Sequence, residues 1–395
     1  RRSGLEEALS SPPFSKLETR DRAFARALAM AALRHLGPID RALAERLERE
    51  PPERVRHILR LGAAQAFWLD VPDFAAVSTS VELAQASKAS RPFKGLVNAV
   101  LRRLIAQEPP PSDPEALAPA WLYARWRAAY GEEADAIAAK IAQEPATDLT
   151  LRGEPPEGLE GELLSGGSFR VAQKGDITAW PGYAEGSWWV QDAAAAVPAR
   201  LLEVKAGESA LDLCAAPGGK TLQLAAAGAH VTALDRSAAR LRRLKENLER
   251  TGLAAEIVVA DAEAWEDART FDAVLLDAPC ASTGTFRRNP DVLWALRPGD
   301  IAKLAQVQAR LLDSAARRVK SGGRLVHCVC SLEPEEGEAQ VGPFLRRNPD
   351  FQLVPIQPGD GGAPAASARD GLLRILPHHL PGGLDGFFAA RFARL

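Results

Sequence analysis

The sequence has 395 residues, of which 46% are hydrophobic and 25% are charged, and its net charge is −2. These values are typical of a globular chain of two or three domains and exclude wholesale disorder. A near-neutral charge does not by itself indicate a nucleic-acid partner, so any basic surface must be local.

The four cysteines are too few for a disulfide framework, and we expect free thiols in a reducing cytosol. The sequence lacks a run of about 18 apolar residues, so no membrane segment is expected. The first residues, RRSGLEEALSS, lack a methionine and an apolar core of signal-peptide length, which favours a trimmed start over an export signal. These features together predict a cytoplasmic protein.

Residues 1–145 are rich in Ala, Leu and Arg and predict an all-α domain. In PPERVRHILRLGAAQAFWL and in FKGLVNAVLRRL, apolar residues recur at helical spacing and form one stripe each. Pro51 and Pro52 suit the start of the first helix. The stripes contain Val55, Ile58, Leu59, Gly62 and Ala66 in the first segment and Val97, Val100, Leu101 and Leu104 in the second.

Residues 146–206 mix β-prone pieces with Gly and Pro turns and predict a small α+β domain that connects the helical part to the rest. In residues 207–395, short apolar runs such as SALDLC, HVTALD, EIVVAD, FDAVLLD and GRLVHCVC alternate with helix-like stretches. One such stretch, RSAARLRRLKENLERTG, is expected to end with Gly252 as its C-cap. This alternation predicts a parallel, doubly wound, Rossmann-like α/β domain.

Polar or glycine-rich groups follow three of these predicted strands. LDLCAAPGGKT places Pro217, Gly218 and Gly219 between a strand and a helix, where a ligand can approach the backbone. Asp235 and Asp261 end the next two strands, where carboxylates accept hydrogen bonds from ribose hydroxyls or an adenine amino group. Each feature alone is explained by a turn or a helix cap. Their succession along one sheet edge favours a nucleoside cofactor.

The cysteines lie in the same motif-like segments. LLDAPC ends a fourth predicted strand with Asp277 and places Cys280 three residues later. In GRLVHCVCS, Cys328 and Cys330 share one face of a strand, with Cys330 nearer the ligand-binding end. We expect Cys328 to be a small buried hydrophobe and Cys214 to pack or to line the cofactor. A single cysteine is more simply core filler, but two thiols and an aspartate at one edge favour a nucleophile site.

A metal centre is the rival interpretation of these thiols. The C-x-C pair stands alone, and His378 and His379 lie far downstream in LPHHLPGG. Because the spacing does not match known ligand sets, no metal is expected.

Several segments resemble the Sun-type RNA cytosine-5 methyltransferases. They are DLCAAPGGKT, LLDAPCASTGTFRRNPDVLW, CSLEPEEGE, LPHHLPGGLDGFFAARF and the upstream SWWVQDAAAAVPARLLEV. The helical region, through VPDFAAVSTSVELAQ and FKGLVNAVLRRL, resembles the RNA-binding domain of the antitermination factor NusB. The combination is similar to bacterial methyltransferases of small-subunit (16S) ribosomal RNA.

This resemblance implies S-adenosyl-L-methionine as the cofactor. The implied cofactor-binding residues are Cys214, Ala215, Ala216, Pro217, Gly218, Gly219, Lys220, Asp235, Asp261 and Asp277. The nucleophile of the family matches Cys330, and the cysteine that assists release of the methylated base matches Cys280. Asp277 is the third implied catalytic residue, as a contact to N3 or N4 of the base.

The chemistry explains why thiols are required. Cytosine C5 is too weak a nucleophile to accept a methyl group unaided, and addition of a thiolate to C6 breaks aromaticity and activates C5. A free thiol has a pKa of about 8.5, so the nucleophile needs a proton acceptor or a favourable electrostatic field.

Residues 88–103, KASRPFKGLVNAVLRR, contain Lys and Arg without any acidic residue. A basic helix face is often merely solvated, but its position in the NusB-like region favours contacts to RNA phosphates. The candidate RNA-binding residues are Lys88, Arg91, Lys94, Arg102, Arg103, Arg287 and Arg288. Trp188 and Trp189 are expected to pack in the core rather than to stack on bases. The target base must leave its stack to reach a thiol.

Two alternatives remain open from the sequence. A non-catalytic RNA-binding or assembly factor would explain residues 1–145 but would leave the thiols without a purpose. A DNA cytosine-5 methyltransferase would use Cys280 as the nucleophile, with Cys330 incidental. For the leading interpretation we expect a monomer that acts on ribosomal RNA and has no membrane contact.

Overall fold

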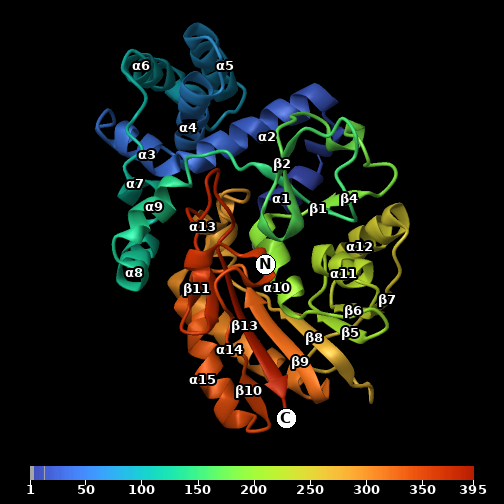
Figure 1. The fold of residues 1–395 in the computed structure, drawn as a ribbon. Helices are drawn as coiled ribbons and strands as arrows, with labels where there is room; N and C mark the ends of the chain where they lie inside the picture. The colour runs from blue at the N-terminus through green and yellow to red at the C-terminus, as the bar shows by residue number, and fades with distance from the viewer. Residues whose placement is uncertain (1–3, 13) are drawn as a thin grey trace. The chain divides into compact units, whose positions relative to one another are not determined.

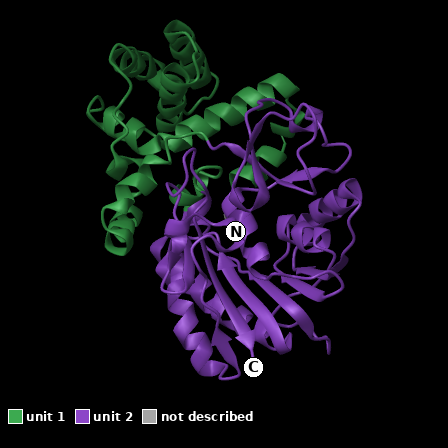
Figure 2. Ribbon diagram, in the orientation of Figure 1, with its two compact units in different colours: residues 1–144, 286–295 green, residues 145–285, 296–395 purple. Residues whose placement is uncertain are grey.

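The computed structural model describes residues 4–12 and 14–395, and the chain divides into two compact units (Figures 1 and 2). Unit 1 comprises residues 1–144 and 286–295, and unit 2 comprises residues 145–285 and 296–395. The stretch 146–206, which we expected as a separate connecting domain, is part of unit 2 in this division.

Unit 1 is built from helices, as the Ala- and Leu-rich sequence predicts. They are α1 (Leu5–Ser10), α2 (Thr19–Arg34), α3 (Leu36–Ala44), α4 (Glu53–Trp68), α5 (Asp73–Gln85), α6 (Lys94–Ile105), α7 (Pro114–Leu117), α8 (Ala120–Tyr130), α9 (Glu133–Ala139) and α13 (Asp291–Ala295). Pro52 occupies the N-cap of α4, close to the helix start that the sequence indicates.

The apolar stripes of α4 and α6 form the core of unit 1. With the exception of Ala66, every residue of the two predicted stripes is buried. Gly62 lies at a close approach between helices, because a Cβ at this position would lie 2.6 Å from Leu101 Cδ1 and 2.7 Å from Ser80 Oγ. The absence of a side chain at Gly62 therefore allows α4 to pack tightly against α5 and α6.

Residues 286–295 belong to unit 1 although their neighbours in sequence belong to unit 2. The Phe286 ring lies 5.8 Å from the Trp126 ring, and Trp294 Nε1 donates a hydrogen bond to the carbonyl of Leu33 (3.1 Å). The Asp291 carboxylate accepts a hydrogen bond from the Leu5 amide (2.9 Å). This segment, which follows the Cys280 loop, therefore completes the helical unit, and the sequence alone did not indicate this.

Unit 2 begins with a small antiparallel sheet in the order β2-β3-β1-β4. Its strands are β1 (Thr147–Leu151), β2 (Gly161–Leu163), β3 (Ser168–Val171) and β4 (Trp188–Val190). A buried ion pair joins Asp148 of β1 to Arg170 of β3, with Oδ1 and Nε 2.8 Å apart. The Arg170 guanidinium also donates to the carbonyls of Pro381 and Gly383 (2.8 Å each), so the pair fastens a C-terminal loop to the small sheet. The Trp188 and Trp189 side chains are buried, as expected.

The larger sheet has the order β11-β12-β13-β9-β8-β5-β6-β7, with β10 paired to β13. Its strands are β5 (Ser209–Leu213), β6 (His230–Asp235), β7 (Glu256–Val259), β8 (Phe271–Asp277), β9 (Val319–Val329), β10 (Phe351–Leu353), β11 (Ala368–Arg369), β12 (Leu372–Ile375) and β13 (Phe387–Arg394). The helices of this unit are α10 (Ala193–Leu201), α11 (Gly219–Ala226), α12 (Ala238–Thr251), α14 (Pro298–Ala316) and α15 (Glu338–Arg347).

The expectation of a parallel sheet is correct for β5 to β9 and wrong for the remaining strands. Strands β7, β6, β5, β8 and β9 pair in parallel, whereas β13 pairs antiparallel with β9, and β10 and β12 pair antiparallel with β13. The mixed sheet arises because the connections between β10 and β13 contain no crossover α-helix that would return each strand in parallel. The α/β class is unchanged.

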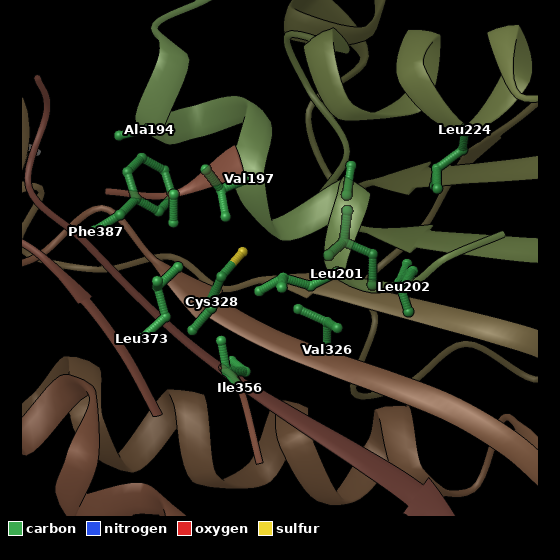
Figure 3. Close-up of a cluster of buried hydrophobic side chains, with 14 of the residues drawn as sticks. Ala194, Val197, Leu201, Leu202, Leu224, Val326, Cys328, Ile356, Leu373 and Phe387 are labelled. Carbon is green, nitrogen blue, oxygen red and sulfur yellow. The ribbon is translucent and has the colours of Figure 1, made fainter. Parts of the chain in front are cut away.

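Both faces of the larger sheet are buried. Along β8, Ala273 and Leu275 join a core on one face, and Val274 and Leu276 join a second core on the other. Cys328 lies in the first core, and Figure 3 shows it among apolar side chains that include Val197, Leu373 and Phe387. A sheet covered on both faces explains the nearly continuous apolar runs in its strand sequences.

Within residues 4–12 and 14–395, no helix is both long enough and apolar enough to cross a membrane.

The Asp148–Arg170 pair predicts a large loss of stability when only one partner is removed. We expect Arg170→Met to lower the free energy of unfolding by about 3–5 kcal/mol, because a buried carboxylate would lose its counter-ion. The matched control is Arg26→Met, whose pair with Glu6 is half exposed and should contribute at most about 1 kcal/mol. Urea unfolding followed by fluorescence measures both, and equal losses would contradict the assigned role.

Candidate active site

The parallel strands bring the predicted polar residues to one edge of the sheet. Asp235 ends β6 and Asp277 ends β8, while Cys214 follows β5 and Asp261 follows β7 after one further residue. All four line a cavity of about 410 Å³, together with Cys280 and Cys330. The cavity therefore lies where open α/β sheets bind their ligands, at the carboxyl ends of the strands.

The loop from Cys214 to Lys220 forms one wall of this region. Cys214 and Gly218 adopt left-handed backbone conformations, with φ of 64° and 110°. A Cβ on Gly218 would lie 2.4 Å from Leu244 Cδ1, so this position requires glycine. Helix α11 starts directly afterwards, at Gly219.

Asp235 fixes this loop from the neighbouring strand. Its Oδ2 accepts a hydrogen bond from the Ala216 amide (3.2 Å) and its Oδ1 accepts one from the Ser237 amide (2.8 Å). The guanidinium of Arg240 lies 3.6 Å from Oδ2. Asp235 therefore shapes the cavity wall in addition to lining it.

Of the ten predicted cofactor residues, Cys214, Ala216, Asp235, Asp261 and Asp277 line the cavity. The others, Ala215, Pro217, Gly218, Gly219 and Lys220, are in the loop or the helix start without lining it. The sequence interpretation missed the cavity residues Arg236, Arg240, Glu263 and Ser282. Arg236 directly follows Asp235, and Glu263 lies two residues after Asp261. Their position beside the strand-end aspartates is the sequence signal that could have identified them.

Asp277 has partners on both carboxylate oxygens. Lys220 Nζ lies 2.8 Å from Oδ2, and the Cys328 thiol donates to Oδ1 at 3.5 Å. Burial alone would lower the pKa of Lys220, but the Asp277 carboxylate outweighs this effect and raises that pKa. Burial, and next the Asp277 charge, raises the pKa of Cys328 well above its usual range. Cys328 is therefore buried as expected, yet it is also a neutral donor to Asp277, which the sequence did not indicate.

The sulfur atoms of Cys280 and Cys330 lie 3.5 Å apart. The hydrogen bond to Cys330, together with burial, raises the pKa of Cys280 well above its usual range. The same hydrogen bond, donated by Cys280, lowers the pKa of Cys330. Ser282 Oγ lies within 3.8 Å of Cys280 Sγ and 3.7 Å of Cys330 Sγ. The pair thus favours a thiolate on Cys330 and a proton on Cys280.

Cys214 differs from this pair. Burial, followed by the charges of Asp235 and Asp277, raises the pKa of Cys214 to about 12. Its thiol therefore stays neutral at physiological pH, which suits a residue that lines the cavity and does not react.

The basic residues predicted to bind RNA divide into two groups. Lys88, Arg91, Lys94, Arg102 and Arg103 are exposed in unit 1. Arg287 is only 1% exposed, so the expectation that its guanidinium meets RNA phosphates is wrong. Its burial follows from its position beside Phe286 in the segment that completes the helical core. Arg288 is partly buried.

Comparison with known proteins finds a matching family for each of the two units. Residues 199–393 match the family model described as 16S rRNA methyltransferase RsmB/F, and residues 1–106 match the NusB family. Ribosomal RNA small subunit methyltransferase B of Salmonella arizonae is 36% identical over 91% of both chains. The protein of the same name from Sodalis glossinidius is 35% identical over 98% of this chain and 93% of the relative.

Among solved structures, that of PH0851 is similar with a TM-score of 0.79 and 26% identity. The similarity covers 98% of this chain and 93% of that chain. It therefore extends over both units and not only over the methyltransferase sheet.

Beneath the cavity, the buried Asp212 predicts a pH-dependent stability. Burial raises the pKa of Asp212 to about 7, and a hydrogen bond from Thr221 Oγ1 (2.6 Å) opposes this rise only in part. Between the ordinary carboxyl pKa of about 4 and pH 7, the folded state binds more protons than the unfolded state. Stability from this group therefore falls as the pH rises through that window.

We expect Asp212→Asn to remove this contribution, because asparagine does not titrate. Its melting temperature relative to the parent should be higher at pH 8 than at pH 5, as measured by calorimetry. The test compares the difference in melting temperature between variant and parent at the two pH values. This comparison is needed because burial also raises the pKa of Glu336, so both proteins lose stability from that group as the pH rises. A difference that does not depend on pH would contradict the assignment.

Proposed function

This chain belongs to the family of 16S ribosomal RNA methyltransferases RsmB/F, with an N-terminal NusB domain, and we propose that it methylates cytosine C5 through a covalent adduct on Cys330. The observation that carries this proposal is the 3.5 Å contact between Cys280 and Cys330 at the cofactor edge of the sheet. A non-catalytic RNA-binding factor would have no use for such a pair.

The residues at the cavity fit the cofactor of the family, S-adenosyl-L-methionine. Carboxylates at Asp235 and Asp261 follow adjacent parallel strands, as recognition of a ribose and an adenine amino group requires. The left-handed Gly218 gives the turn that carries the chain from Cys214 and Ala216, which line the cavity, into helix α11. When bound, S-adenosyl-L-methionine supplies an electrophilic methyl group on its sulfonium. We assign cofactor binding to the loop Cys214–Lys220 and to Asp235, Asp261 and Asp277.

Cys330 is the nucleophile in this proposal. Its thiolate, stabilised by the hydrogen bond from Cys280, adds to C6 of cytosine and transfers an electron pair into the ring. C5 then has the electron density that acceptance of a methyl group requires. Asp277, held by Lys220 and Cys328, accepts a hydrogen bond from N4 of the base, or from N3 once N3 is protonated, and so stabilises the protonated base that takes up the electron pair.

Cys280 acts after the new C5 bond has formed. Water takes the C5 proton, the electron pair of the C5–H bond forms the C5–C6 double bond, and the Cys330 thiolate leaves C6, which restores the aromatic ring. The thiol of Cys280 is placed to donate its proton to the departing Cys330 sulfur, which favours release of the RNA. This division of roles predicts opposite outcomes for the two cysteine substitutions.

We expect the parent protein to release tritium from RNA that carries [5-³H]cytidine. Cys280→Ala should accumulate a protein–RNA adduct that survives denaturing electrophoresis, because loss of the Cys280 thiol impairs release more than it slows addition. Cys330→Ala should form no adduct and release no tritium. The reverse pattern, with adduct in Cys330→Ala alone, would support the DNA-type assignment in which Cys280 is the nucleophile.

The exposed basic residues of α6 are the proposed RNA phosphate contacts of unit 1. Arg102 and Arg103 lie in the last turn of that helix with exposed side chains. The double variant Arg102→Ala/Arg103→Ala should weaken RNA binding and reduce the slope of log affinity against log salt by about 2. Filter binding across a salt series measures this slope. Arg56→Ala, which removes an arginine paired with Glu50, is the control and should leave the slope unchanged.

A further inference from the structure

Glu336 is a completely buried carboxylate near the thiol pair, and the mechanism above does not use it. It ends the short 3₁₀ helix η6 (Pro334–Glu336) of unit 2 and is 0% exposed. The cavity is lined by other residues, so Glu336 does not meet the cofactor or the base directly. A buried carboxylate is costly unless it is well hydrogen-bonded, so its partners show what it does.

One set of partners lies on both sides of Cys280. The Ala281 amide donates to both carboxylate oxygens of Glu336, at 3.0 and 3.1 Å. Gln308 Nε2 donates to Glu336 Oε1 (3.0 Å) and also to the carbonyl of Pro279 (3.0 Å). The peptide groups immediately before and after Cys280 are therefore held by two buried side chains that contact each other.

The other partner lies directly after Cys330. Ser331 Oγ donates to Glu336 Oε2 at 2.5 Å and lies 3.3 Å from Thr283 Oγ1. The Gly284 amide donates to the carbonyl of Cys330 (3.0 Å). One carboxylate thus joins the end of β9 to the loop that presents the second thiol, so a shift of either segment disturbs the other.

The charge of Glu336 acts on the same thiol pair that its hydrogen bonds hold in place. Burial raises the pKa of Glu336 to about 7, and the hydrogen bonds from Ser331, Ala281 and Gln308 oppose this rise. The charge of Glu336 contributes to the raised pKa of Cys280, after the hydrogen bond to Cys330, burial and the charge of Cys330. The ionised carboxylate therefore helps to keep the proton of the thiol pair on Cys280.

We propose that Glu336, together with Gln308, is a positioning residue for the thiol pair: by holding the peptide groups around Cys280 and the hydroxyl beside Cys330, it sets the distance between the two sulfur atoms and helps to keep the proton on Cys280. The inference rests on the proposed function for its catalytic meaning. The effect of Glu336 on the position and reactivity of the two thiols is a property of the protein alone and can be tested without RNA.

The variant that tests the proposal is Glu336→Gln, which keeps the shape of the side chain and removes its charge. Because its amide group would face donors, at least one of the present hydrogen bonds is lost. Methylation of RNA should show a kcat at least tenfold lower, since small misplacement of reacting groups is costly. The KM for S-adenosyl-L-methionine should stay within twofold, because Glu336 does not line the cavity.

A second readout is independent of methylation. The parent and the variants are labelled with iodoacetamide, and the rates at Cys280 and Cys330 are measured by peptide mass spectrometry. In the parent, Cys330 should react faster, because the thiolate is the reactive form. In Glu336→Gln, the ratio of the Cys330 rate to the Cys280 rate should fall at least fivefold. Glu335→Gln, the neighbouring exposed glutamate, is the matched control and should leave both rates unchanged.

The proposal is overturned if Glu336→Gln keeps either the labelling ratio or kcat within twofold of the parent. If this variant does not fold, Gln308→Met replaces it, since that change removes the bond to Pro279 and one bond to Glu336 without removing the charge. Its labelling ratio should fall in the same direction, and an unchanged ratio overturns the proposal equally. A parent that shows the expected labelling but no methylation would refute the proposed function and leave the positioning role intact.

Discussion

The contact between the Cys280 and Cys330 sulfur atoms is the interaction on which the account of this protein depends. At 3.5 Å, one thiol can donate to the other, and the donation distinguishes the two chemically. Two isolated cysteines at the same edge would have similar reactivity. In the proposed mechanism, the shared proton leaves Cys330 as the nucleophile and Cys280 as the acid, and addition to and release from a base require these two roles.

The fold produces this contact by placing β8 and β9 side by side. The two strands are parallel, and Asp277 pairs with Cys328 in register, so the residues that follow each strand emerge at the same edge. Cys328 lies in β9 and Cys330 directly follows the strand, and both pack against the core on one face of the sheet, where Cys328 reaches Asp277. The antiparallel strand β13 closes the other side of β9. The register of β8 and β9 thus brings the ends of the two strands together, and the loops that follow them carry Cys280 and Cys330.

Much of this arrangement could be predicted from the sequence, because strand ends and period-2 alternation are local properties. The succession of Asp235, Asp261 and Asp277 indicated the sheet edge at which the cavity lies, and the spacing of Cys328 and Cys330 indicated a shared face. The proposed role of Glu336 could not be predicted, since it depends on Ala281 and Gln308, which are distant from it in sequence. The burial of Arg287 was missed for a related reason: residues 286–295 pack in the helical unit, and no local pattern reports such packing.

The most direct test of the central claim is to locate the bond between protein and RNA. In RNA substituted with 5-fluorocytidine, fluorine replaces the C5 proton, so the ring cannot be restored and the adduct formed by the parent protein persists. Digestion and mass spectrometry then identify the modified peptide. The account predicts that the nucleotide is attached to the peptide containing Cys330. Attachment to the peptide containing Cys280 would contradict it.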